Sequence, residues 1–94
     1  MMKYNISKTT KFKKDYKLAK KRGMDISKLT KVITMLAEGE KLPVEYHDHA
    51  LAGNWVWHRE CHIEPDWLLV YYIEDDVLVL TLTRTGTHSD LFGI

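Results

Sequence analysis

The chain has 94 residues, of which 45% are hydrophobic and 29% are charged. This length suits one globular domain, so we expect residues 1–94 to form a single domain, and the composition excludes a disordered protein. Cys61 is the only cysteine, which excludes an internal disulfide and a zinc site made of several thiolates. No apolar run approaches the roughly 18 to 20 residues of a membrane span, and residues 1–14 do not resemble a signal peptide. We therefore expect a cytoplasmic protein without membrane contact.

The formal net charge of +1 hides an uneven distribution of charge along the chain. Residues 1–42 carry twelve basic and four acidic side chains, whereas residues 43–94 carry two basic and nine acidic ones. All five histidines lie in the acidic half. Folding must therefore bring the basic half of the chain and the histidines together.

Two consecutive helices are predicted in the basic half. The first begins after an N-cap at Thr9 or Thr10 and ends at Gly23, and the second begins after Asp25 and ends at Gly39. Their apolar residues recur at the spacing of a buried helix face: Phe12, Tyr16 and Ala19 in the first, and Ile26, Leu29, Val32, Ile33 and Leu36 in the second. Two helices in this order predict an αα-hairpin.

Strands are predicted at the start of the chain and in its second half. Residues 3–7 alternate between apolar and polar, and residues 55–63, 67–73 and 77–84 are rich in aromatic and β-branched side chains. Residues 41–53 read as a long polar loop, a kind of segment that is often functional. Helices followed by strands, without βαβ alternation, predict an α+β fold with two N-terminal helices packed on a small antiparallel sheet.

Alternation along residues 55–63 separates an apolar face from a polar one. The odd positions Trp55, Trp57, Cys61 and Ile63 form the apolar set, and the even positions are His58, Glu60 and His62. If the helices cover the odd face, His58 and His62 stand on the open face, about 13 Å apart, too far to act on one atom. A site at His62 therefore needs partners from other segments, and the candidates are His47, His49, Asp66 and His88.

Several imidazoles with one carboxylate suit the cleavage of RNA without a metal or cofactor. One group takes the proton of the ribose 2′-hydroxyl, another protonates the leaving 5′-oxygen, and a cation stabilises the charged phosphorane. Histidine titrates near neutral pH and can serve in either role, while Arg84 is the candidate cation. A basic helix is the candidate grip on RNA, through Lys8, Lys11, Lys13, Lys14, Lys17, Lys20, Lys21 and Arg22.

Each feature also has an ordinary structural interpretation. A lysine-rich helix face is often only solvated, and a single histidine is more often structural than catalytic. The pair His47 and His49 could bind a metal, but Cys61 cannot join His62 in such a site, because adjacent strand residues point to opposite faces. The tryptophans Trp55, Trp57 and Trp67 could stack on bases, although we expect at least two of them in the core.

Three short segments resemble a known protein family. They are YHDHALAG at residues 46–53, RECHIEPDW at residues 59–67 and TRTGTHSDLFG at residues 83–93. They resemble the YafQ branch of the RelE-type toxins of bacterial type II toxin-antitoxin modules, as does DYKLAKKRGMDISKL at residues 15–29. The resemblance covers nearly the whole chain, and the ordered combination is far more specific than any one segment.

The resemblance implies a compact fold of the microbial ribonuclease type and an endoribonuclease that cleaves translated mRNA in the A site of the 70S ribosome. Cleavage without metal would leave a 2′,3′-cyclic phosphate, or its opened 3′-phosphate, and a 5′-hydroxyl. The implied catalytic set is His49, His62, Asp66 and His88, with Trp67, Arg84 and Phe92 as neighbouring contributors. We favour His49 or Asp66 as the base, His88 as the acid and His62 as the group that steadies charge. The choice of His49 over His47, and the inclusion of Asp66, rest on the resemblance alone.

The resemblance also implies partners. An antitoxin of the DinJ or RelB kind would wrap the basic surface, and the pair would bind its own operator DNA to repress transcription. Two other functions stay open: a ParE-like toxin that inhibits DNA gyrase, and a non-catalytic RNA-binding or ribosome-binding module. The four residues of the implied catalytic set argue against both, because neither function needs them.

Overall fold

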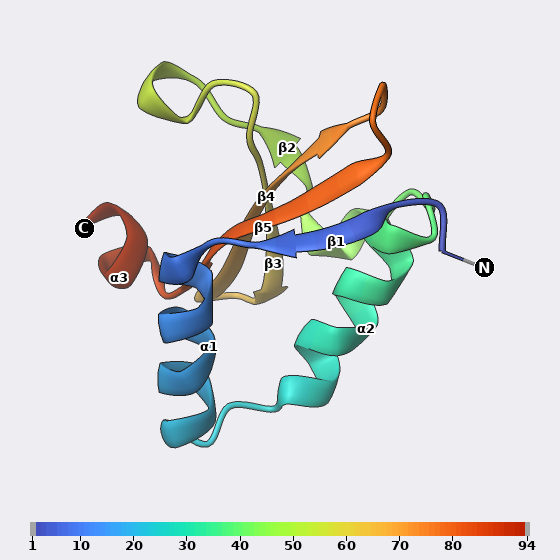
Figure 1. Cartoon of the computed structure of the whole chain (residues 1–94). Coiled ribbons are helices and arrows are strands. Elements are labelled where there is room, and N and C mark those ends of the chain that lie inside the picture. Colours follow the sequence, from blue (N-terminus) through green and yellow to red (C-terminus); the bar gives the residue numbers. More distant parts are fainter. Residues whose placement is uncertain (1, 94) are drawn as a thin grey trace.

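The computed structural model describes residues 2–93 and contains one five-stranded sheet with two long helices on one face (Figure 1). The strand order is β1-β5-β4-β3-β2, with β1 at Asn5–Lys8, β2 at His49–Ala50, β3 at Arg59–Glu64, β4 at Trp67–Glu74 and β5 at Val79–Gly86. The antiparallel sheet expected from the sequence is present in β2 to β5, and β1 joins it as an edge strand parallel to β5. Within residues 2–93, no helix is both long and apolar enough to cross a membrane.

The two long helices begin and end close to the predicted residues. Helix α1 spans Thr10–Lys21 and helix α2 spans Ile26–Ala37. The Thr9 hydroxyl caps α1 by accepting the Phe12 backbone N–H at 3.0 Å, which selects Thr9 over Thr10 as the N-cap. Gly23 follows α1 with a φ of +76°, where a side chain would be strained. From this turn the helices diverge toward the sheet as an open V (Figure 1), so both pack on strands.

The main core lies between the two helices and one face of the sheet. Its buried side chains include Phe12, Ala19, Leu29, Val32, Leu36, Cys61, Ile63, Trp67, Leu69, Tyr71, Leu80 and Leu82. The opposite face has a smaller cluster, made of Leu68, Val70 and Leu91 with the half-buried Leu51, Trp55 and Phe92 against it. Only part of this second face is covered, which leaves room on it for a site.

Three segments differ from the prediction. Strand β3 begins at Arg59, because Gly53–Trp55 form a 3-10 turn (η2) and Trp57 has a left-handed backbone with a φ of +75°. The expectation that Trp55 and Trp57 lie on the same face as Cys61 and Ile63 was therefore wrong. Trp55 packs against the smaller cluster on the opposite face, and the side chain of Trp57 is 85% exposed. The predicted loop at 41–53 contains a 3-10 turn (η1, Val44–Tyr46) and strand β2. Such short elements carry too little periodicity to be recognised in a sequence.

The end of the chain forms a short helix, α3 (His88–Phe92), which the sequence did not reveal. Thr87 and Asp90 bond each other's backbone N–H groups at 3.0 Å in a capping box. Arg22, at the end of α1, donates to the Asp90 carboxylate at 2.7 Å. These contacts, the Arg22 bond foremost, lower the pKa of Asp90 to about 2. The ion pair ties α3, and with it His88, to α1.

Replacing Asp90 with Asn should make the stability of the protein less dependent on acid pH. A carboxylate whose pKa is lowered by folding stabilises the native state above its ordinary pKa, and this contribution is lost as the pH falls through the folded value. The free energy of unfolding of the native protein, measured by urea denaturation, should therefore exceed that of the variant at about pH 5 and approach it near pH 2. Asp76→Asn, at an exposed carboxylate of the β4–β5 turn, is the control, and its free energy of unfolding should follow that of the native protein at both pH values. Equal pH dependence of the free energy of unfolding in Asp90→Asn and native protein would contradict a stabilising ion pair between Arg22 and Asp90.

Candidate active site

Strand alternation places three polar side chains on the open face of the sheet. His49 of β2 lies opposite Glu60 of β3, and His62 lies two residues further along β3, so the three share one face. Cys61 and Ile63, between and beyond them, are buried on the helix side. The predicted assignment of His62 to the open face is confirmed. His58 precedes β3 and its ring contacts Trp55 and Tyr72, at 5.5 and 4.9 Å between ring centroids, outside the cluster.

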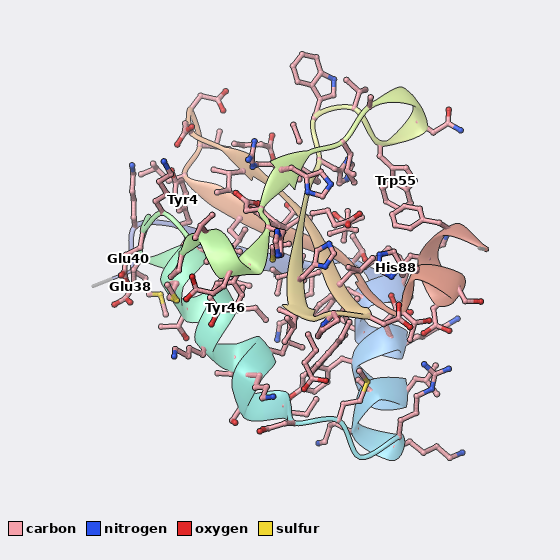
Figure 2. The ribbon with its side chains drawn as sticks, turned by 180° about the vertical axis from the view of Figure 1, so that it is seen from behind. Tyr4, Glu38, Glu40, Tyr46, Trp55 and His88 are labelled. Atoms are coloured by element: carbon pink, nitrogen blue, oxygen red, sulfur yellow. The ribbon has the colours of Figure 1, made fainter. Side chains whose placement is uncertain are left out.

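The start of α3 brings a fourth polar side chain to this face. The ring of His88 lies 5.7 Å from that of His62, and Figure 2 shows the labelled His88 beside the ribbon of α3. Asp66, in the turn between β3 and β4, accepts both the backbone N–H of His88 at 2.9 Å and its Nδ1 at 2.6 Å. These two bonds hold the pKa of Asp66 below its ordinary value, the backbone bond being the larger cause. Asp66 therefore stays ionised and fixes the orientation of the His88 ring.

Glu60 is the member of the cluster that the sequence analysis missed. Its side chain is 7% exposed, and its Oε1 lies 3.3 Å from Nε2 of His62 and 3.9 Å from Nε2 of His49. The strand phase had already placed Glu60 beside His62, and this was the signal that could have identified it. A buried carboxylate is unfavourable unless a hydrogen-bond donor or cation faces it, and the imidazole of His62, at 3.3 Å, occupies that position.

Asp48 anchors the segment around strand β2 that carries His47 and His49. Its carboxylate points away from the open face, accepts the hydroxyl of Tyr71 at 2.6 Å and pairs with Arg59 at 3.1 Å. Burial and the neighbouring Asp48 raise the pKa of Tyr71, so the phenol remains a donor. The residues on either side of Asp48 consequently face the cluster: the rings of His47 and His49 lie 5.5 and 6.5 Å from that of His62.

The hydrogen bonds of two imidazoles define which ring nitrogen is free. Nδ1 of His49 lies 2.8 Å from the carbonyl oxygen of His47, which can only accept, so Nδ1 carries the proton and the Nε2 of a neutral ring is a free base. Nδ1 of His88 faces the Asp66 carboxylate in the same way, which leaves its Nε2 available. The site thus offers one oriented base and one carboxylate-supported imidazole on opposite sides of His62.

A hollow beside the cluster gives a substrate room. It has a volume of about 600 Å³ and its lining includes Tyr46, His47, His62 and Pro65. One atom from each of Glu60, His62 and His88 could also meet at a cation, because these atoms lie within 4.8 Å of one another. A carboxylate with two imidazoles is a suitable ligand set for a divalent metal ion. The absence of a metal from the reaction therefore stays a prediction.

The residues expected to support RNA binding lie in different environments. Arg84 is half-buried, with its guanidinium on Asp15 at 2.6 and 3.2 Å. Trp67 was a candidate for RNA contact, but its side chain is only 1% exposed, so it cannot stack on a base. It lies in the core and donates its indole N–H to the Thr85 hydroxyl. Phe92 is half-buried and packs on Trp55 at the open face. The basic side chains of α1 are exposed: Lys11, Lys13, Lys14, Lys17, Lys20, Lys21 and Arg22.

Comparisons with known proteins identify the family of the chain. The family described as "Bacterial toxin of type II toxin-antitoxin system, YafQ" matches residues 4–93. The "mRNA interferase toxin YafQ" of Escherichia coli K12 is 43% identical over 94 residues, 99% of this chain and 100% of the relative. The "Putative toxin YafQ" of Haemophilus influenzae is 35% identical over 89% of this chain and 87% of its own length.

Solved structures share the fold. The crystal structure of the E. coli DinJ-YafQ toxin-antitoxin complex matches with a TM-score of 0.89 and 42% identity, over 98% of this chain and 100% of that one. A metal-bound toxin from Helicobacter pylori matches with a TM-score of 0.89 and 43% identity, over 98% and 100% of the two chains. The predicted α+β fold of the RelE type is confirmed. The chain belongs to the YafQ family of toxins of bacterial type II toxin-antitoxin systems.

Proposed function

We propose that this chain is the toxin of a type II toxin-antitoxin module and acts as an endoribonuclease that cleaves translated mRNA in the ribosomal A site, inhibiting translation in the cytoplasm. The observation that carries the proposal is the pair of oriented imidazoles, His49 and His88, on either side of His62. The name of the E. coli relative, an mRNA interferase, supports the same activity.

The mechanism assigns one proton transfer to each side of the cluster. Nε2 of His49 takes the proton of the ribose 2′-hydroxyl, and the resulting oxygen attacks the adjacent phosphorus. His88 donates a proton to the leaving 5′-oxygen, which gives a 2′,3′-cyclic phosphate and a 5′-hydroxyl. Asp66 orients His88, and the pKa of its own carboxyl is lowered. A carboxylate with a lowered pKa is a weaker base, so His49 is the better choice for the base.

Two groups stabilise the charge that develops on the phosphate. His62, held by Glu60, is placed between the base and the acid. Arg84 of β5 pairs with Val70 of β4, and Val70 pairs with Glu60 of β3. The side chain of Arg84 therefore leaves the sheet on the same face as the cluster. Arg84 is bound to Asp15, and contact with a phosphate requires the guanidinium to share this carboxylate or leave it. Phe92 contributes an aromatic surface beside His88, while Trp67 supports the neighbouring Asp66 from the core.

The exposed lysines of α1 serve the sequence-independent part of binding. Phosphate contacts by lysine release counterions and weaken as salt rises. We place Lys11, Lys13, Lys14, Lys17, Lys20 and Lys21 on ribosomal RNA rather than on the cleaved mRNA. Arg22 is committed to Asp90 and acts by holding α3.

Primer extension on mRNA from cells that produce the protein tests the activity. Cuts should appear in register with codons and vanish when translation is blocked. His88→Ala should reduce the single-turnover rate by about a hundredfold or more, because general acid catalysis typically contributes 10² to 10⁴. Asp76→Ala, at an exposed residue of the β4–β5 turn outside the cluster, is the control and should cleave at the native rate. Intact mRNA together with stalled DNA gyrase would contradict the proposal, and full activity of His88→Ala would contradict its role as the acid.

We also propose the antitoxin as partner, of the acidic DinJ or RelB kind, with operator DNA bound only by the complex. An apolar groove of about 430 Å³ runs between α1, α2 and β1, lined by Ile6, Phe12, Tyr16, Ile33 and Leu82 among others. Lys8, Lys13 and Lys17 surround it. An apolar floor with a cationic rim suits an amphipathic segment that carries acidic residues.

Ile6→Glu should weaken the toxin-antitoxin complex, because it places a carboxylate on the apolar floor against an acidic partner. Ile6 is 40% exposed, so the change costs little stability. Calorimetry with the product of the neighbouring antitoxin gene should give a dissociation constant at least about tenfold higher, whereas Val44→Glu, at an 87% exposed valine outside the groove, should bind like the native protein. Equal affinities for native protein and Ile6→Glu would remove the groove from the interface.

A further inference from the structure

Trp57 combines an exposed side chain with an unfavourable backbone. Its indole is 85% exposed, and its φ is +75°, a conformation that bulky residues rarely adopt because Cβ crowds the neighbouring carbonyl. Neither burial nor local conformation explains a tryptophan at this position. Strained residues of this kind concentrate at sites that contact ligands.

A row of aromatic rings leads from α3 to a hollow that Trp57 also lines. Phe92 of α3 contacts Trp55 at 5.9 Å between ring centroids, Trp55 contacts His58 at 5.5 Å, and His58 contacts Tyr72 at 4.9 Å. The row begins on the helix that carries His88 and ends at a second hollow. The rings meet edge to face, at interplanar angles between 74° and 87°, so the row is a packed support for the hollow. An exposed aromatic ring beside it can stack on a base of a single strand.

The second hollow has the chemistry of a nucleobase site rather than a phosphate site. Its volume is about 410 Å³, within the range of small-ligand sites, and its lining is Val56, Trp57, His58, Tyr72, Ile73 and Glu74. No lysine or arginine lines it, so it offers no charge for a phosphate. The apolar and aromatic walls match the flat face of a base, and the Glu74 carboxylate can accept a hydrogen bond from an exocyclic amino group.

We propose that Trp57 and this hollow form a nucleobase subsite, in which the indole stacks on a base of the mRNA a few nucleotides from the cleaved phosphate. The subsite rests on the proposed function, because the RNA that occupies it is the strand that crosses the histidine cluster. The walls fix the position of the base, and Glu74 favours bases that present an amino group. Trp57 acts in substrate binding and takes no part in proton transfer.

Base stacking on Trp57 can be detected with 2-aminopurine, a fluorescent base whose emission falls when it stacks. The mRNA carries 2-aminopurine at one position at a time on either side of the cleavage site, and 2′-deoxyribose at the cleaved nucleotide to prevent the reaction. Native protein, Trp57→Gly and Leu78→Gly are each added to ribosomes programmed with this mRNA. Leu78 is the matched control, because it is also an exposed apolar residue with a left-handed backbone, at a φ of +55°.

At one position in the mRNA, the fluorescence of 2-aminopurine should fall when native protein or Leu78→Gly is added. At that same position it should stay unchanged when Trp57→Gly is added. With all-ribose mRNA, the KM of Trp57→Gly should rise by about fivefold or more, the lower end of a base-stacking contribution, with kcat little changed. The subsite is overturned if no position distinguishes Trp57→Gly from the control. It is also overturned if Trp57→Gly weakens binding to ribosomes equally with and without mRNA, which would identify a protein-docking residue. Failure of native protein to cleave all-ribose mRNA would instead remove the proposed function.

Discussion

A carboxylate buried among histidines is the constraint on which the rest of the site depends. Glu60 is almost inaccessible to water on the open face of the sheet, and its Oε1 lies 3.3 Å from Nε2 of His62 and 3.9 Å from Nε2 of His49. An unpaired carboxylate in such a place costs roughly several kcal/mol. This cost favours structures in which the imidazoles stay near Glu60. Glu60 is therefore a positioning residue that holds two of the imidazoles of the cluster in contact distance.

Two further carboxylates, those of Asp48 and Asp66, orient the histidines around Glu60. Asp48 binds Tyr71 and Arg59 on the helix side and so presents the residues before and after it to the cluster. Asp66 holds His88 through both its backbone and its ring. His49 and His88 are thus each oriented by a hydrogen bond of Nδ1, to a carbonyl and to a carboxylate respectively, and His62 lies 3.3 Å from the Glu60 carboxylate. Orientation of this kind matters because general acid-base catalysis requires the proton-carrying atom within hydrogen-bond reach of its substrate atom.

The sequence predicted the parts of the fold that have a strong period. Both long helices and the assignment of Cys61 and His62 to opposite faces followed from spacing. The residue types predicted Asp25 as the N-cap of α2 and left Thr9 and Thr10 open for α1. Alternation could not distinguish His47 from His49, because residues two apart in an extended segment share a face, and both rings do approach His62. The five-residue helix α3 and the two-residue strand β2 were missed because neither spans two periods.

The burial of polar residues was the second feature that the sequence did not predict. A glutamate in a half-polar strand reads as a surface residue, and Glu60 becomes buried only when β2 and α3 close around it. The contact between Asp66 and His88 joins residues 22 apart, and nothing in their spacing indicates it. Trp57 was misassigned because a period-two pattern assumes extended backbone, and the left-handed residue before β3 breaks that pattern.

The most direct test of this account is the single-turnover rate of mRNA cleavage by Glu60→Gln on translating ribosomes. The glutamine keeps the size of the side chain and removes the charge that faces the imidazoles, so the rate should fall by about a hundredfold while the protein stays folded. Asp76→Asn, at an exposed carboxylate of the β4–β5 turn that does not line the hollow, should cleave at the native rate. A Glu60→Gln variant that cleaves as fast as the native protein would contradict the central role given to the buried carboxylate.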